Sequence, residues 1–165
     1  IAIEAMKCFP DARLFIVGEG EEYANLKALA ALHNVADRVT FAGARPQSEL
    51  SYWYSAADAL VLCSSREGWA NVLLESMACG TPVVATPLGG TPEVVQSPDA
   101  GRLMANRSVN ALVDAIGDLF SAYPSRIAVR AYAEQFDWAE TTRRQLALFK
   151  QIMDGRAAAD PTLKT

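Results

Sequence analysis

Histidine and cysteine are scarce in this chain of 165 residues, which contains one histidine and three cysteines. Cys8, Cys63 and Cys79 are far apart and each lies in an apolar stretch, so the sequence implies no disulfide framework. A structural zinc site usually needs four nitrogen or sulfur ligands at short spacings, and these cysteines with His33 do not supply such a set. We therefore expect a metal-independent protein from a reducing compartment.

An excess of positive charge is also missing, because 15 Lys and Arg stand against 19 Asp and Glu, a formal net charge of -4. Without a positive field the protein does not attract a phosphate backbone, which excludes nucleic acid as an expected partner. No apolar run approaches the roughly 20 residues that span a bilayer, and the N-terminus lacks a signal-type segment. We expect a cytoplasmic location.

What remains is the composition of one globular domain, with 51% apolar and 21% charged residues. Short apolar runs alternate with segments of helical periodicity. Such alternation predicts a Rossmann-like α/β domain, in which a parallel sheet has helices on both faces. The predicted strands are 13–17, 39–41, 59–63 and 82–85, and the predicted helices between and before them are 1–9, 21–34, 48–57 and 72–79.

Beyond Gly101 the pattern is helical only, with periodic segments at 109–120, 125–135 and 138–153. These segments predict C-terminal helices that complete the domain at residue 154. The last residues, 155–165, lose the pattern and are predicted to form a frayed tail.

The loops after the strands are the places to look for a site, because ligands of open α/β sheets bind beyond the carboxyl ends of the strands. The first such loop contains Gly18 and Gly20. A dinucleotide fingerprint needs a third glycine three residues later, and Tyr23 stands there instead. A nicotinamide-dependent oxidoreductase is therefore disfavoured.

The loop after the third predicted strand is the most informative. Glu67 and Gly68 precede Asn71, which can cap a helix from Val72 onward, and Glu75 follows in about its first turn. Free amides and the helix dipole form an anion site there, and glycine permits close approach to the backbone. Because carboxylates accept hydrogen bonds from hydroxyl pairs, the two glutamates suit a ribose diol and a hexose diol on either side of a diphosphate. The alternative is that Glu75 only complements the helix dipole.

The segment resembles the signature of the group 1, retaining glycosyltransferases of the GT-B fold. The resemblance starts at Glu67, runs through 75–84 and 89–95, and includes the upstream segments 14–20 and 36–43, so roughly the first two-thirds of the chain is covered. It implies the C-terminal, donor-binding half of a GT-B fold. The first strand of that half and the N-terminal acceptor domain, which would be a partner in the same protein, are not in this chain.

The resemblance also implies a role for each candidate residue. Glu75 would hold the ribose hydroxyls, and Glu67 would be the catalytic residue that contacts the transferred sugar and stabilises positive charge at its anomeric carbon. The remaining donor-binding candidates would contact the nucleotide sugar through loop or backbone atoms: Gly68, Trp69, Ala70, Asn71 and Val72 at the sugar and phosphates, and Gly18, Gly20, Ala44 and Arg45 around the base.

The implied activity is transfer of a hexose from a UDP-, GDP- or ADP-sugar to an acceptor without a metal, in polysaccharide synthesis, with peripheral membrane association as an option for the full-length enzyme. The arginine and lysine with which the family binds the diphosphate precede the first helix, so we expect this fragment alone to be inactive. Two alternatives stay open, a GT-B-fold sugar-nucleotide epimerase and a non-catalytic nucleotide-sugar-binding module. Trp53 and Tyr54 are assigned to the core and to the surface of their helix.

Overall fold

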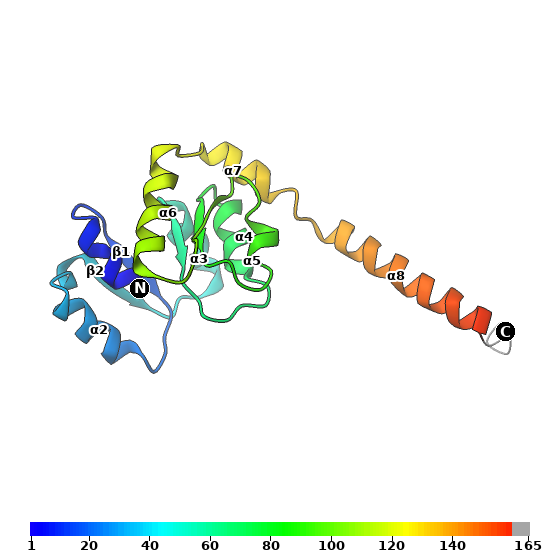
Figure 1. The fold of residues 1–165 in the computed structure, drawn as a ribbon, viewed down its shortest axis with the longest axis horizontal. Helices are drawn as coiled ribbons and strands as arrows, with labels where there is room; N and C mark the ends of the chain where they lie inside the picture. The colour runs from blue at the N-terminus through cyan, green and yellow to red at the C-terminus, as the bar shows by residue number, and fades with distance from the viewer. Residues whose placement is uncertain (160–165) are drawn as a thin grey trace. The chain divides into compact units, whose positions relative to one another are not determined.

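The computed structural model describes residues 1–159, in which strands and helices alternate as far as the fifth strand (Figure 1). All the strand pairs within these residues are parallel, and they form two sheets. One sheet consists of β1 (Leu14–Val17) and β2 (Val39–Gly43), and the other has the order β3 (Leu60–Leu62), β4 (Val83–Ala85), β5 (Gly101–Leu103).

The chain divides into two compact units, Ile1–Ala133 and a second that begins at Glu134 and contains the last helix. The helices of the first unit are α1 (Ala2–Ala5), η1 (Met6–Cys8), α2 (Tyr23–Leu32), η2 (Ala36–Arg38), α3 (Gln47–Ala56), α4 (Asn71–Ala78), α5 (Thr91–Val94), α6 (Val109–Ser121) and α7 (Arg126–Ala133). The second unit contains α8 (Trp138–Ala159).

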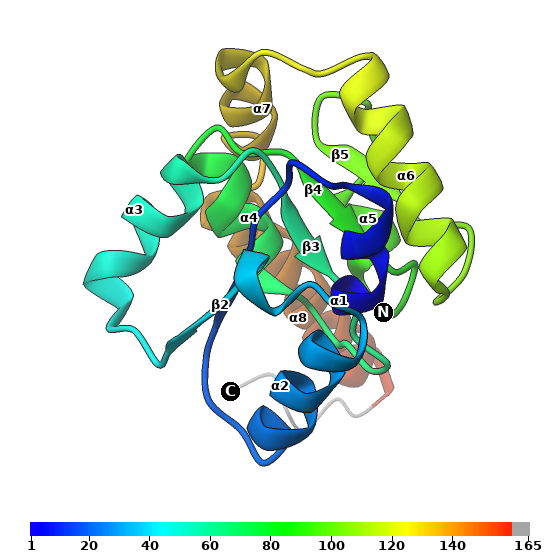
Figure 2. The same ribbon diagram turned by 90° about the vertical axis from the view of Figure 1, so that its left-hand side faces the viewer.

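Strand β4 lies at the centre of the core, because its side chains are buried on both faces. Val83 and Ala85 pack into a cluster with α4 and α7, and Val84 packs into another cluster with α1 and α6. All three side chains are fully buried. Figure 2 shows α4 and α6 on opposite sides of this strand. A continuous apolar run with alternate residues on opposite faces is what a parallel strand covered by helices requires.

Strand β1 is covered on one face only, and that face is partly buried. Leu14 and Ile16 pack into a third cluster, with α1 and α2, whereas Phe15 is 51% exposed on the opposite face. The ring of Phe15 lies 5.9 Å from that of Trp53 in α3. This contact places α3 beside the outer face of the two-stranded sheet.

Arg38 ties the start of β2 to the beginning of the chain. Its Nη1 donates to the backbone carbonyl of Met6, the first residue of η1, at 3.2 Å and to that of Phe9, just after η1, at 2.6 Å. A guanidinium can satisfy several such carbonyls at once, so the Asp-Arg-Val segment at 37–39 has a structural role.

The predicted α/β fold with parallel strands and helices on both faces is confirmed. The strands form two sheets, because within residues 1–159 no strand lies between β1 and β3 to join their edges. Strand β5 was missed. Its Gly101 has a φ of +145°, and a Cβ there would lie 1.9 Å from the carbonyl oxygen of Val83, so the strand begins with a glycine that a propensity argument reads as a loop.

Two further elements differ in extent from their predictions. The first helix is α-helical only to Ala5 and continues as a 3-10 turn, which ends before Pro10. Helix α8 continues through the predicted end of the domain at 154 to Ala159, across alanines that favour helix. The predicted tail at 155–165 is thus helical in its first part, and 160–165 lie outside the described residues.

Candidate functional site

The loop between β3 and α4 is held against the end of β4 by a buried threonine. The side chain of Thr86 donates to the carbonyl of Ser64 at 3.0 Å, and its own amide donates to the carbonyl of Leu62 at 3.0 Å. Glu67 follows in this loop and is half-buried. In the described part of the chain its carboxylate has no hydrogen bond or ion pair, so it is available to a ligand.

A pair of glycines after β4 packs directly onto this loop. The amide of Gly90 donates to the carbonyl of Gly68 at 2.7 Å. A Cβ on Gly89 would lie 2.0 Å from the carbonyl oxygen of Glu67, and a Cβ on Gly90 would lie 2.6 Å from the Trp69 ring. Because Gly89 also has a φ of +54°, both space and backbone conformation require glycine there. The glycines therefore fix the backbone that carries Glu67.

Helix α4 begins one residue earlier than predicted, and no side chain caps it. Asn71 is its first residue, the N-cap position is Ala70, and the Asn71 amide donates to the carbonyl of Trp69 at 3.1 Å. The prediction that Asn71 caps the helix was wrong, because a capping side chain must stand one residue before the helical segment. Among residues 1–159 the amides of Trp69, Ala70 and Val72 have no hydrogen-bond partner, which leaves donors for an anionic or hydroxylated ligand.

Helix α4 starts at Asn71, so Glu75 lies in its second turn, and the first turn contains no acidic residue. The effect of a helix dipole falls off within the first turn, so the alternative that Glu75 serves only the dipole is disfavoured. The hydroxyl of Tyr54 in α3 donates to Oε2 of Glu75 at 3.0 Å. Burial of the phenol, followed by this hydrogen bond and the carboxylate charge, raises the pKa of Tyr54. The phenol therefore stays protonated at neutral pH and remains a hydrogen-bond donor.

A second buried threonine locks α3 and α4 together. The hydroxyl of Thr81 donates to the carbonyl of Tyr54 at 2.7 Å, and it accepts from Nη1 of Arg126 at 3.0 Å. Nη2 of Arg126 donates to the carbonyl of Ala57 at 2.7 Å, and the hydroxyl of Ser76 donates to the carbonyl of Thr81 at 3.0 Å. The Gly-Thr-Pro segment after α4 therefore anchors the end of α3, which carries Tyr54.

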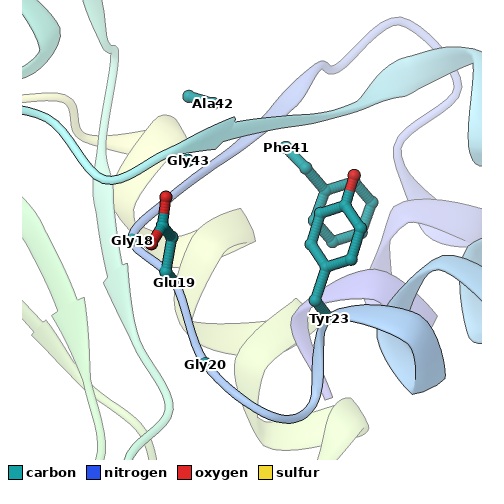
Figure 3. A pocket seen from close by; sticks show the side chains of 7 residues that line it. All are labelled: Gly18, Glu19, Gly20, Tyr23, Phe41, Ala42 and Gly43. Atoms are coloured by element: carbon teal, nitrogen blue, oxygen red, sulfur yellow. The ribbon is translucent and has the colours of Figure 1, made fainter.

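A pocket of about 550 Å³ opens at the carboxyl ends of β1 and β2 (Figure 3). Its volume lies within the range of small-molecule sites, roughly 300 to 1,000 Å³. The Tyr23 ring meets the Phe41 ring edge-on, with 5.3 Å between centroids. The residues that line the pocket are Gly18, Glu19, Gly20, Tyr23, Phe41, Ala42 and Gly43.

The other two base-binding candidates, Ala44 and Arg45, follow the pocket residue Gly43 in the chain and do not line the pocket. The amide of Ala44 donates to Oε1 of Glu19 at 3.4 Å. The guanidinium of Arg45 lies 5.5 Å from the centre of the Trp53 ring, and Nη1 of Arg45 is 4.0 Å from Oε2 of Glu49. Two consecutive residues of α3 therefore make contacts on different sides of the helix. Trp53 contacts Phe15 and Arg45, and Tyr54 contacts Glu75.

The sequence placed Tyr54 on the helix surface, whereas its hydroxyl contacts the candidate residue Glu75. Sequence spacing could not indicate this contact, because Glu75 is 21 residues away and belongs to another helix. Glu19, between Gly18 and Gly20, also lines the pocket, and the spacing of residues in the sequence does not indicate this. In the part of the chain that the structure describes, no three His, Cys, Asp or Glu side chains gather into a metal-binding group, and no helix is long and apolar enough to cross a membrane.

Comparison with known proteins gives a consistent family match. The model of the family "Glycosyl transferases group 1" matches residues 1–136. A D-inositol 3-phosphate glycosyltransferase of Mycolicibacterium gilvum is 34% identical over 167 residues, which cover 97% of this chain and 37% of the relative. The chain thus spans well under half the length of this relative.

Solved structures agree with the sequence match. Sucrose-phosphate synthase from Thermosynechococcus elongatus superposes with a TM-score of 0.79 at 29% identity, over 93% of this chain and 42% of that one. HepE from Anabaena, solved in complex with UDP, has a TM-score of 0.76 at 26% identity, over 90% of this chain and 43% of that one.

Proposed function

The chain belongs to the group 1 glycosyltransferases, and from this membership we propose that it is the donor-binding domain of a retaining enzyme that transfers a hexose from a nucleotide sugar. Its Rossmann-like α/β fold is the one seen in solved GT-B glycosyltransferases. Because the chain spans 37% of a curated relative, the activity of the whole protein is part of the proposal.

The observation that carries the proposal is the combination of an oriented Glu75 with an uncapped helix start. One oxygen of Glu75 accepts from Tyr54, which leaves Oε1 without a hydrogen-bond partner among the described residues. The unpartnered amides at Trp69, Ala70 and Val72 lie one turn earlier along the same segment. A ribose diol at the carboxylate and diphosphate or sugar oxygens at the amides match these groups in charge and hydrogen bonding.

Glu67 supplies the second carboxylate in this proposal. Its backbone is fixed by Gly89, whereas its side chain has no partner within residues 1–159. A carboxylate held close to the anomeric carbon stabilises the positive charge that develops there as the bond to the leaving diphosphate breaks. Transfer would proceed with retention, as in the retaining members of the family.

The base would enter the pocket that Gly18 and Gly20 help to line, with Ala44 and Arg45 in the segment that follows the pocket residue Gly43. Glycine permits the backbone to approach a ligand, and the Tyr23 ring offers a flat apolar surface. In support, a structural neighbour with 26% identity was solved with UDP bound. The pocket itself does not select one base, so UDP-, GDP- and ADP-sugars are all candidates.

The whole enzyme would contain a further strand and an acceptor domain. In support, β1 and β3 each pair on one side only within the described residues, and a parallel strand between them would join the two sheets. Orientation of the sugar and exclusion of water from the reaction require both walls of a cleft, and in this proposal the chain supplies one wall. We expect the chain alone not to transfer sugar, and clear turnover of a sugar nucleotide with an acceptor would contradict this.

The test is an NMR titration of the chain with UDP, GDP and ADP. We expect one nucleotide to bind with micromolar to millimolar affinity, with shifts at residues of the 64–75 segment, and Glu75→Ala to weaken binding at least about tenfold. Asp114→Ala is the matched control, because it removes one exposed carboxylate from α6. Equal affinity of the wild type and Glu75→Ala would refute the proposed donor site.

A further inference from the structure

The hydrogen bond from Tyr54 to Glu75 assigns a role to a residue outside the donor-binding candidates. We propose that Tyr54 is a positioning residue that orients the Glu75 carboxylate and thereby gives the site its preference for ribonucleotides over deoxyribonucleotides. The inference rests on the proposed function of Glu75 as the partner of the ribose hydroxyls. It adds to that function the group that orients the carboxylate, the Tyr54 hydroxyl, which donates to Oε2 of Glu75 at 3.0 Å.

The position of the phenol is set by a rigid part of the molecule. Its backbone carbonyl accepts from the fully buried Thr81, and Thr81 is itself held by Arg126 of α7. Nη2 of Arg126 also donates to Ala57, one residue beyond α3. Tyrosine has few rotatable bonds, so once its backbone is fixed the hydroxyl can hold a partner at a small entropic cost.

The carboxylate, by contrast, belongs to a flexible side chain. Glutamate has several rotamers in a helix, and ordering such a side chain costs free energy. The 3.0 Å hydrogen bond to Oε2 orders it before a ligand arrives and leaves Oε1 free to accept. A ribose hydroxyl then meets a carboxylate that is already oriented, whereas a deoxyribose lacks that hydroxyl and gains nothing from the orientation.

The experiment measures dissociation constants for the nucleoside diphosphate that binds best and for its 2′-deoxy and 3′-deoxy forms. Tyr54→Phe removes only the hydroxyl and keeps the ring. We expect it to weaken binding of the ribonucleotide about five- to tenfold and to change binding of at least one deoxy form less than about twofold. Tyr52→Phe is the matched control, because Tyr52 is in the same helix and 74% exposed. It should change neither constant.

The outcomes separate this inference from the proposed function. If Glu75→Gln abolishes the ribose preference while Tyr54→Phe leaves it intact, the positioning role is refuted and the donor site stands. If Tyr54→Phe weakens all three nucleotides equally with an unchanged fold by circular dichroism, its effect is general and the positioning role is again refuted. If the wild type binds no nucleotide, or binds all three forms equally, the proposed function of Glu75 fails and this inference fails with it.

Discussion

Replacing Gly89 by alanine should disturb the site more than any change of equal size on the surface. The added methyl group would lie 2.0 Å from the carbonyl oxygen of Glu67 and 2.8 Å from that of Gly68. Carbon and oxygen atoms that are not bonded to each other rarely approach within about 3 Å, so one of the two loops has to move by roughly 1 Å or more. The residue would also keep a φ of +54°, which alanine adopts at a penalty of about 1 kcal/mol.

The two effects together should lower the free energy of unfolding by about 2 kcal/mol or more. Urea denaturation followed by circular dichroism measures this change. Because the displaced loop carries Glu67, binding of the preferred nucleotide should also weaken about tenfold or more, since a shift of about 1 Å can remove much of an oriented interaction.

Gly117→Ala is the control for this substitution. Gly117 lies within α6, and a Cβ there would meet no atom within 4 Å. Alanine is the better helix former, so this variant should gain about 0.5 to 1 kcal/mol and bind nucleotide normally. Unchanged stability and unchanged binding of Gly89→Ala would refute the close packing of the two loops, and a destabilised Gly117→Ala would refute the reasoning from space around the glycines.

Two further predictions concern contacts outside the loops. Arg38→Met should lower the free energy of unfolding by about 1.5 to 3 kcal/mol in urea denaturation, because the carbonyls of Phe9 and Met6 lose a charged donor; a change below about 0.5 kcal/mol would contradict the role given to this guanidinium. Burial and Glu75 raise the pKa of Tyr54 above its ordinary value of 10.0, so the unfolded chain releases this proton first and stability should fall as the pH rises above 10. Denaturation at several alkaline pH values should show a smaller fall for Tyr54→Phe, and an equal fall would contradict the buried hydrogen bond.

Most strands and helices could be predicted because buried segments of this sequence are marked by apolar residues at regular spacing. Val83 to Ala85 is apolar on both faces, which is how a strand between two layers of helices must read. Strand β5 left no such trace, because Gly101 and Arg102 interrupt it and its place is set by pairing with Val83 and Val84. The resemblance implied a missing strand, but the position of the gap between β1 and β3 could not be predicted, since the apolar pattern of a strand does not tell which neighbour it pairs with.

In the candidate site, too, residues within one continuous segment could be predicted from the sequence, and a residue brought in by packing could not. Glu67 and Glu75 could be proposed from spacing, because both belong to one continuous strand-loop-helix segment whose ends the sequence marks. The start of α4 was misplaced by one residue, which turned Asn71 from a first helical residue into an expected cap. Tyr54 could not be found, because only the packing of α3 against α4 brings its hydroxyl to the carboxylate.

The Gly-Thr-Pro segment after α4 and the Gly-Gly segment after β4 have a structural role that needs no contact with a ligand. Thr81 joins the end of α3 to α7, and Gly89 with Gly90 presses one loop onto the backbone of the other. Thr81 holds the backbone of Tyr54, and the Tyr54 hydroxyl orients Glu75. Gly89 and Gly90 hold the loop that carries Glu67. Because each carboxylate is held by its own set of contacts, the separation between the two can stay constant, as the proposed nucleotide-sugar donor with its diphosphate between two diols requires. Substitutions at Thr81 or Tyr54 should therefore affect binding of the ribose, and substitutions at Gly89 or Gly90 should affect binding of the transferred sugar.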